Sequence, residues 1–494
     1  MKSLKHRTAG SLKWNLVDRL AGQVLYAVTG IVLARMLSPD DFGLVGAALV
    51  FQAFASLLVD SGFSYALLQR QRPTRLDYST VLWFNMALSV VLYAILFVAA
   101  PLIADWFRHD DRLVPVARVL FLSIILNAAT IVQTNRLMKA MDVRRVALSN
   151  ALGIALGGAV GIVLAVAGHG VWAIVWQTLA NAAIRAVVLW TTTRWRPLRR
   201  FSWASLRSFF GLGSRMMLTS FLNTVFLNIY SFFIGNRVGL GALGYYTQSD
   251  KWSKMGISSL SQTLTSSFVP ALSAVQDDPE RYRRLCSKMT RFTAYVLFPA
   301  MIWLAVAAKP IFHGLFGTKW DPSILLFQIL LLRGISVVLT SLSTNFLLAA
   351  GHGGAIVRLE IVRDVLSLGA LVATFPYMAL STSDDPVQGL AVMLWAQLAA
   401  SAVSWAVTVW VMLRNTGLSA AAHLRDLAPY LALTALTVPL MYLAGGLFVN
   451  PWLIMTAEAA VALAVYLGIN ALFGSQVQKD VFSYLRKGLS GSRS

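Results

Sequence analysis

Residues 10–43 read GSLKWNLVDRLAGQVLYAVTGIVLARMLSPDDFG, and this stretch decides how the rest of the chain is interpreted. It is apolar and long enough to form a helix that crosses a membrane. Polar residues recur in it at steps of three and four, which places them on one helix face: Asn15, Asp18, Arg19, Gly22, Gln23, Tyr26 and Thr29. Because lipid cannot solvate such groups, we expect this stripe to face a wet cavity or partner helices.

The composition of the chain is that of a polytopic membrane protein. Of its 494 residues, 57% are hydrophobic and 13% are charged, whereas soluble proteins carry roughly 25% charged residues. The mean hydropathy is +0.66. The net charge of +21 arises mostly from short loops between apolar runs, so it indicates membrane topology and no nucleic-acid partner.

Fourteen apolar spans can be counted, and the distribution of Lys and Arg fixes their direction. The spans cover residues 13–36, 43–66, 80–101, 114–134, 146–167, 171–192, 208–234, 242–270, 290–308, 324–349, 356–376, 387–413, 427–447 and 451–473. Basic residues concentrate in every second connection, including residues 69–79, 135–145, 194–207 and 271–291. By the positive-inside rule these connections and both termini are cytoplasmic. The basic loop 271–291 holds the single cysteine, Cys286.

A second polar-striped stretch, residues 213–244, repeats the features of the first. Arg35 corresponds to Arg237 and Gly43 to Gly244, so the two stretches are offset by about two hundred residues. Six spans follow each start, which predicts two pseudo-symmetric six-helix lobes related by an axis along the membrane normal. The predicted parts are an N-terminal lobe (1–205), a C-terminal lobe (206–425), and two further helices with a cytoplasmic tail (426–494).

Charged residues inside the spans are the candidate site residues, because an unpaired charge in the bilayer is costly and usually functional. The basic candidates would bind an anionic substrate from a central lumen: Arg19, Arg215, Lys251, Lys254, Arg333 and Arg363. The acidic candidates would couple transport to an ion: Asp18, Asp60, Asp250 and Asp364. Four cations near span ends are equally explained by snorkelling to the interface: Arg118, Arg185, Lys251 and Arg363.

Several chemistries are excluded or disfavoured by the sequence. The chain has no G-x-x-x-x-G-K-[ST] motif for ATP and no D-x-D motif. Residues 239–244 match G-x-G-x-x-G, but they join two membrane helices and therefore form a tight turn. The histidines lack metal-ligand spacing, so we expect no metal site and no catalytic residue. The glycines Gly153, Gly157 and Gly161 predict close helix packing.

Three short motifs resemble bacterial polysaccharide exporters of the Wzx type, in the multidrug/oligosaccharidyl-lipid/polysaccharide exporter superfamily. Residues 33–44 are similar to L-A-R-x-L-S-P-x-D-F-G-L, which follows the first helix in that family. Residues 60–69 resemble the D-x-G-F-x-x-A-L-x-Q end of its second helix, and residues 243–246 resemble the L-G-x-Y start of its eighth.

The resemblance implies an inner-membrane flippase without enzymatic activity, acting by alternating access. Its substrate would be an undecaprenyl-diphosphate-linked oligosaccharide for lipopolysaccharide or exopolysaccharide, driven by a proton or sodium gradient without other cofactors. Polysaccharide polymerase or export machinery would be a further partner. Two alternatives stay open: a cation-coupled small-molecule exporter on the same fold, and an integral-membrane enzyme of surface glycans.

Overall fold

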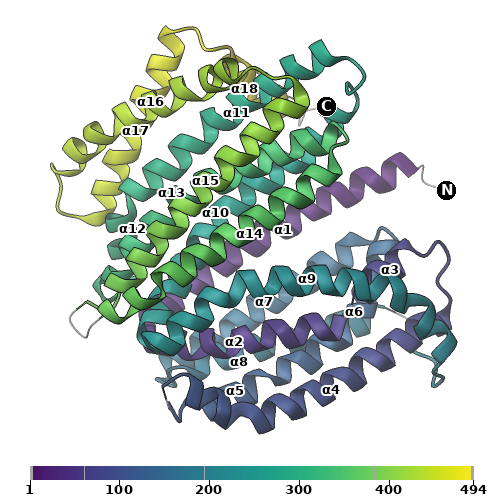
Figure 1. The fold of residues 1–494 in the computed structure, drawn as a ribbon. Coiled ribbons are helices and arrows are strands. Elements are labelled where there is room, and N and C mark those ends of the chain that lie inside the picture. Colours follow the sequence, from purple (N-terminus) through teal and green to yellow (C-terminus); the bar gives the residue numbers. More distant parts are fainter. Residues whose placement is uncertain (1–3, 61, 109, 194, 382–384, 491–494) are drawn as a thin grey trace. The chain divides into compact units, whose positions relative to one another are not determined.

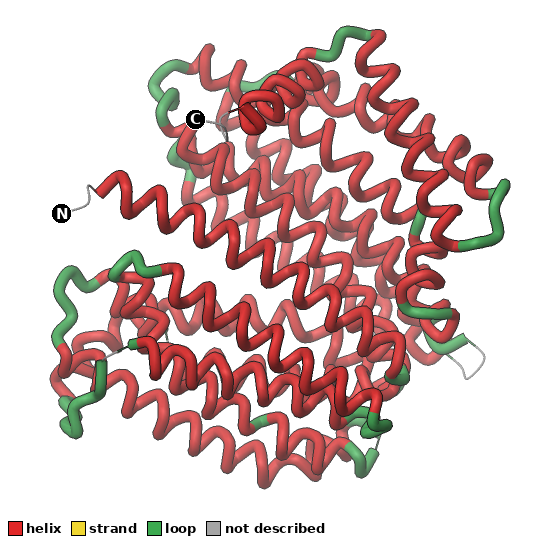
Figure 2. Tube along the Cα trace, turned by 180° about the vertical axis from the view of Figure 1, so that it is seen from behind, coloured by secondary structure: helices red, strands yellow, loops and turns green. Residues whose placement is uncertain are grey.

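The computed structural model describes residues 4–60, 62–108, 110–193, 195–381 and 385–490, which form only helices and loops (Figure 2). Ten of the helices within these ranges are long and apolar enough to cross a membrane. The chain is therefore a multi-pass, all-α membrane protein, as the sequence predicts. Four other long helices lie outside this set: α1 (Leu4–Met36), α9 (Trp203–Arg237), α10 (Leu240–Ser273) and α14 (Gly353–Thr374).

The first of two compact units ends at Thr247. In it α1 packs along α7, α7 packs along α8, and α2 and α4 both contact α9 (Figure 1). The helices of this unit between α1 and α9 are α2 (Pro39–Asp60), α3 (Phe63–Gln69), α4 (Arg75–Trp106), α5 (Leu113–Leu120), α6 (Leu122–Lys139), α7 (Val143–Val166) and α8 (Trp172–Thr192).

The second unit begins at Gln248, inside α10. In it α13 packs against α11 and α15, and α16 packs against α11 and α17. In addition to α14 and the larger part of α10, this unit contains α11 (Pro279–Val306), α12 (Ala308–Leu315), η1 (Thr318–Trp320), α13 (Asp321–Ala349), η2 (Phe375–Leu380), α15 (Gln388–Thr416), α16 (Ala420–Gly445), α17 (Pro451–Leu472) and α18 (Gln476–Ser490).

Two features of the connections differ from the sequence interpretation. The basic connection 271–291 is largely helical, because Asp278 caps the start of α11 and Pro279 occupies its first turn. Cys286 therefore lies in α11, where it is fully buried. The boundary between the two compact units, at Thr247, groups α9 with the preceding helices. The predicted lobes are defined by the sequence repeat instead, so their division at residue 205 stays a prediction.

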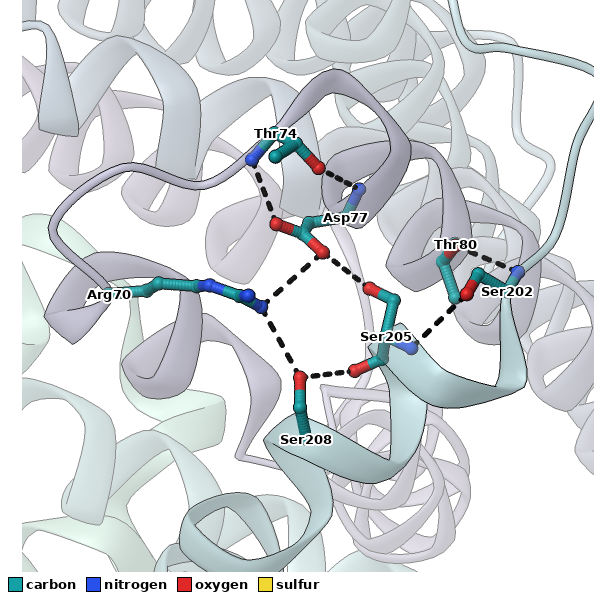
Figure 3. A network of polar contacts seen from close by, with 7 residues as sticks. All are labelled: Arg70, Thr74, Asp77, Thr80, Ser202, Ser205 and Ser208. Atoms are coloured by element: carbon teal, nitrogen blue, oxygen red, sulfur yellow. Dashed lines mark hydrogen bonds and ion pairs between the residues drawn. The ribbon is translucent and has the colours of Figure 1, made fainter.

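A polar network fastens the start of α9 to the start of α4 (Figure 3). Its centre is the buried carboxylate of Asp77, which accepts hydrogen bonds from the backbone N–H of Thr74 at 2.8 Å and from Ser205 Oγ at 2.5 Å. Arg70 adds an ion pair at 3.3 Å and also donates to Ser208. Since a buried carboxylate is stable only when its oxygens are satisfied, this network holds α9 in place.

Apolar packing surrounds this network. Phe63 and Leu67 of α3 form one buried cluster with Val81 of α4, Val132 of α6 and Leu206 of α9. Gly62, in the turn before α3, has a φ of +67°. A Cβ there would lie 2.3 Å from the carbonyl oxygen of Gly213 in α9, so the turn requires glycine for both its conformation and its contact.

Candidate functional site

The polar stripe of α1 lies partly against α7, one of the two environments the sequence allowed. The side-chain amide of Asn150 donates to Asp18 Oδ2 at 3.2 Å. Eleven residues further along α1, the buried Thr29 meets Gly158 so closely that a Cβ on that glycine would lie 2.2 Å from Thr29 Cγ2. Arg19 is half-buried. The side chains of Asn15 and Arg215 fall outside the described residues.

The predicted packing role of the α7 glycines is confirmed. A Cβ on Gly157 would lie 2.9 Å from the backbone oxygen of Gln177, and one on Gly153 would lie 2.7 Å from Asn181 Oδ1. Both partners belong to α8, so the glycines allow α7 and α8 to approach closely.

Residues of α2, α3, α6 and α8 line a polar cavity. Its volume is about 420 Å³. We call it the Asp60 cavity, and its polar lining includes Ser56, Asp60, Asn127, Thr134, Asn135 and Arg185. It brings the predicted acidic candidate of α2 together with side chains that the sequence did not single out.

A chain of hydrogen bonds orients Asp60. The amide of Asn135 donates to Ser64 Oγ at 2.8 Å, and the Ser64 hydroxyl donates to Asp60 Oδ1. This chain crosses from α6 through α3 to the last residue of α2, whose carboxylate also accepts a hydrogen bond from the backbone N–H of Ser64.

Arg185 is the residue that sequence reasoning missed. It lies seven residues before the end of α8, about two turns, and its side chain is half-buried. Its Nε is buried, and within the described residues that atom finds no hydrogen-bond partner. The buried hydroxyl of Thr134 is unpartnered in the same sense. The sequence does contain one signal against snorkelling: Arg185 lies more than one helical turn from the end of α8.

In the second unit, carboxylates on the same helix neutralise two of the predicted cations. Lys254 Nζ lies 2.7 Å from Asp250 Oδ2 across one turn of α10. Arg363 pairs with both Glu360 and Asp364 in α14. The local charge of that α14 cluster is therefore negative, which disfavours the predicted contact between Arg363 and an anion.

The two remaining predicted cations of this unit have other surroundings. Lys251 Nζ lies 5.1 Å from the ring centroid of Trp252, which also packs against Phe316. Arg333 is half-buried in α13, and its Nε is buried without a hydrogen-bond partner in the described part of the chain. Arg333 thus retains the free donor that an anion site needs.

The sequence of residues 32–325 matches the family model described as polysaccharide biosynthesis protein. The chain belongs to this family, whose members include exporters of the Wzx type. Among similar proteins, the succinoglycan biosynthesis transport protein ExoT of Rhizobium meliloti is 25% identical over 72% of each chain. The lipopolysaccharide biosynthesis protein WzxC of Escherichia coli is 24% identical over 75% of each chain.

The fold of this chain is also similar to the folds of solved transporter structures. The inward closed conformation of the lipid II flippase MurJ has a TM-score of 0.70 at 12% identity, covering 94% of this chain and 98% of that one. An inward-facing multidrug resistance MATE transporter of the MOP superfamily has a TM-score of 0.60 at 18% identity, covering 82% and 99%. This polysaccharide biosynthesis protein therefore has the fold of MOP-superfamily transporters.

Proposed function

We propose that the protein is a flippase that moves an undecaprenyl-diphosphate-linked oligosaccharide across the bacterial inner membrane for surface polysaccharide export. The observation that carries the proposal is the Asp60 cavity, a polar space among membrane helices where the buried Nε of Arg185 has no hydrogen-bond partner within the described residues. Such groups are expensive to keep in a membrane unless they handle a polar cargo. The names of ExoT and WzxC, which link them to glycan biosynthesis, support a glycan as that cargo.

The membrane arrangement that we propose has fourteen spans, with α1, α9, α10 and α14 crossing beside the ten apolar helices. Exposed apolar side chains on α14, among them Val357, Ile361 and Val365, support its crossing. Both termini would be cytoplasmic, and the lobes 1–205 and 206–425, with the appendix 426–494, would rock to expose a central site alternately.

The diphosphate and the driving ion would use different charges. Arg19, Arg215, Lys251 and Arg333 are our candidates for the diphosphate, whereas Lys254 and Arg363 have carboxylate partners that reduce their attraction for an anion. Asp18, Asp60, Asp250 and Asp364 remain candidates for coupling to a proton or sodium gradient. Polysaccharide polymerase or export machinery would receive the flipped glycan.

Deletion of the gene tests this function in the cell. A flippase mutant loses its surface polysaccharide and accumulates lipid-linked repeat units in the inner membrane, and the wild-type gene restores both. The alternative, a cation-coupled drug exporter on the same fold, predicts drug sensitivity with normal polysaccharide, and that result would overturn our proposal.

A further inference from the structure

The Asp60 cavity combines one carboxylate and one guanidinium that do not neutralise each other. Within the described residues, Asp60 and Arg185 form no ion pair, and the side-chain partner of Asp60 is the Ser64 hydroxyl. The cavity between them is lined by further neutral donors and acceptors, including Asn127, Thr134 and Ser56. Both groups line the same space of about 420 Å³, and the carboxylate of Asp18 on α1 also attracts Arg185.

We propose that the Asp60 cavity binds a neutral, polyhydroxylated sugar ring. This inference rests on the proposed function, because it assigns part of the carried oligosaccharide to a specific chamber of the first unit. A sugar hydroxyl both donates and accepts hydrogen bonds, so a ring can donate to the Asp60 carboxylate and bind Arg185 and Thr134, whose buried polar atoms have no described partners, at once.

The charge pattern argues against the two simpler ligands. A phosphate site presents donors and positive charge, and the Asp60 carboxylate would repel an anion. A metal-cation site presents oxygen ligands, and the Arg185 guanidinium would repel that cation. Only a ligand that needs both kinds of partner uses Asp60 and Arg185 together, and a neutral sugar does.

The unsatisfied atoms point to the same ligand class. Arg185 Nε and Thr134 Oγ1 are buried without partners in the part of the chain that the structure describes. Leaving a buried polar atom unpaired is unfavourable, so both atoms favour a bound ligand with oxygen atoms. The volume lies within the range of about 300–1,000 Å³ that is common for small-molecule sites.

The position of the cavity suits a ligand that enters from the basic side. Asp60 is the last residue of α2, and Asn135 lies four residues before the end of α6. These ends lead into the connections around residues 70–74 and 140–142, which the basic-residue pattern assigns to the cytoplasm. A glycan approaching from that side meets this chamber near the helix ends.

A thiol-protection experiment tests this assignment. Asn127→Cys is made in a Cys286→Ser background and labelled in nanodiscs with a water-soluble maleimide. The matched control is Met138→Cys, an exposed position on the same helix that does not line the cavity. The probes are the host's own undecaprenyl-diphosphate oligosaccharide, undecaprenyl diphosphate without sugar, and sodium chloride. Binding of the oligosaccharide lipid to the same sample is measured by native mass spectrometry.

We expect the oligosaccharide lipid, at about ten times its dissociation constant, to slow labelling of Asn127→Cys about tenfold. The sugar-free lipid and sodium should leave the rate unchanged, and Met138→Cys should be insensitive to all three. Equal protection by sugar-free lipid, or protection by sodium, overturns the sugar assignment. Binding of the oligosaccharide lipid without protection overturns it while the proposed function stands. Absence of any binding overturns the proposed function itself.

Discussion

Gly43 and Gly244 correspond in the repeat that the sequence predicts, and each packs against the first residue of the other's helix. A Cβ on Gly43 would lie 1.8 Å from the carbonyl oxygen of Leu240, and one on Gly244 would lie 1.9 Å from that of Pro39. Leu240 and Pro39 are separated by the same 201 positions as the two glycines. The contact is therefore reciprocal, as a twofold relation between two helix pairs requires.

Substitution of either glycine by alanine should destabilise the protein. The new methyl group would collide with backbone atoms of the facing helix in either variant. The starts of α2 and α10 must therefore separate, at a cost of about 1–3 kcal/mol. Thermal unfolding in detergent, followed by tryptophan fluorescence, measures this. The matched control is Gly211→Ala in α9, where a Cβ meets nothing within 4 Å. Equal melting temperatures for Gly43→Ala and the control would contradict the reciprocal contact.

Arg185→Gln should separate stability from transport. Because burial disfavours the charge of Arg185 more than Asp18 stabilises it, its removal relieves a desolvated charge, and the melting temperature should stay equal or rise. Export should fall about tenfold or more, since a charged hydrogen bond contributes about 1.5–3 kcal/mol. Surface polysaccharide and the melting temperature of the purified protein report the two effects. Full export by a well-folded Arg185→Gln protein would remove Arg185 from the site.

Arg333 and Arg363 should respond differently to the same change. Arg333→Gln removes a half-buried cation whose Nε has no described partner, so the protein should remain folded while export falls. Arg363→Gln leaves Glu360 and Asp364 facing each other without their shared guanidinium. Its melting temperature should therefore drop and partly recover at lower pH, where a carboxylate takes up a proton. The same melting behaviour in both variants would refute this distinction.

Asp77→Ala should loosen the start of α9. The substitution leaves the Thr74 amide, Ser205 and Arg70 without their common acceptor, which should cost about 2–4 kcal/mol. Ser208→Ala is the comparison, because it removes only two exposed hydrogen bonds, one from Arg70 and one to the backbone oxygen of Ser205, and should change stability by less than about 0.5 kcal/mol. Hydrogen exchange at the start of α9 should increase only in Asp77→Ala, and unchanged exchange there would show that apolar packing alone holds the helix.

The Asp110–Arg112 pair predicts a small effect of pH outside the membrane helices. Arg112 donates to both oxygens of Asp110, at 3.0 and 2.7 Å, and this lowers the pKa of that carboxyl. A lowered folded-state pKa stabilises above the ordinary value of about 4 and loses its contribution as pH falls through the folded value. The partly exposed pair should contribute less than about 1 kcal/mol. The melting difference between wild type and Arg112→Gln should thus be positive at pH 7 and vanish near pH 2; a constant difference would contradict the pairing.

The sequence predicted the helical architecture because hydrophobic runs and loop charges are local signals. It also predicted that Gly43 and Gly244 correspond, because each ends one of two similar stretches that are offset by about two hundred residues. It did not predict that these two glycines would meet, because an offset gives correspondence and not distance. The same holds for the Asp60 cavity, which α2, α6 and α8 form only when they pack.

Charge partners were the least predictable feature. Lys254 and Arg363 each have a carboxylate within four residues, so helical spacing already allowed the pairing that the structure shows. The sequence explained Arg185 equally well by snorkelling, although the residue lies about two turns inside α8. Its lack of a partner depends on tertiary packing, which no sequence window contains.

Translocation in proteoliposomes tests the central claim most directly. The purified protein is reconstituted with the host's undecaprenyl-diphosphate oligosaccharide, and a glycosidase added outside reports the arrival of glycan in the outer leaflet. We predict protein-dependent exposure of the glycan, faster under an imposed proton or sodium gradient and lost in Arg185→Gln. Glycan exposure at the rate of protein-free vesicles, with folded protein and either gradient present, would contradict the account.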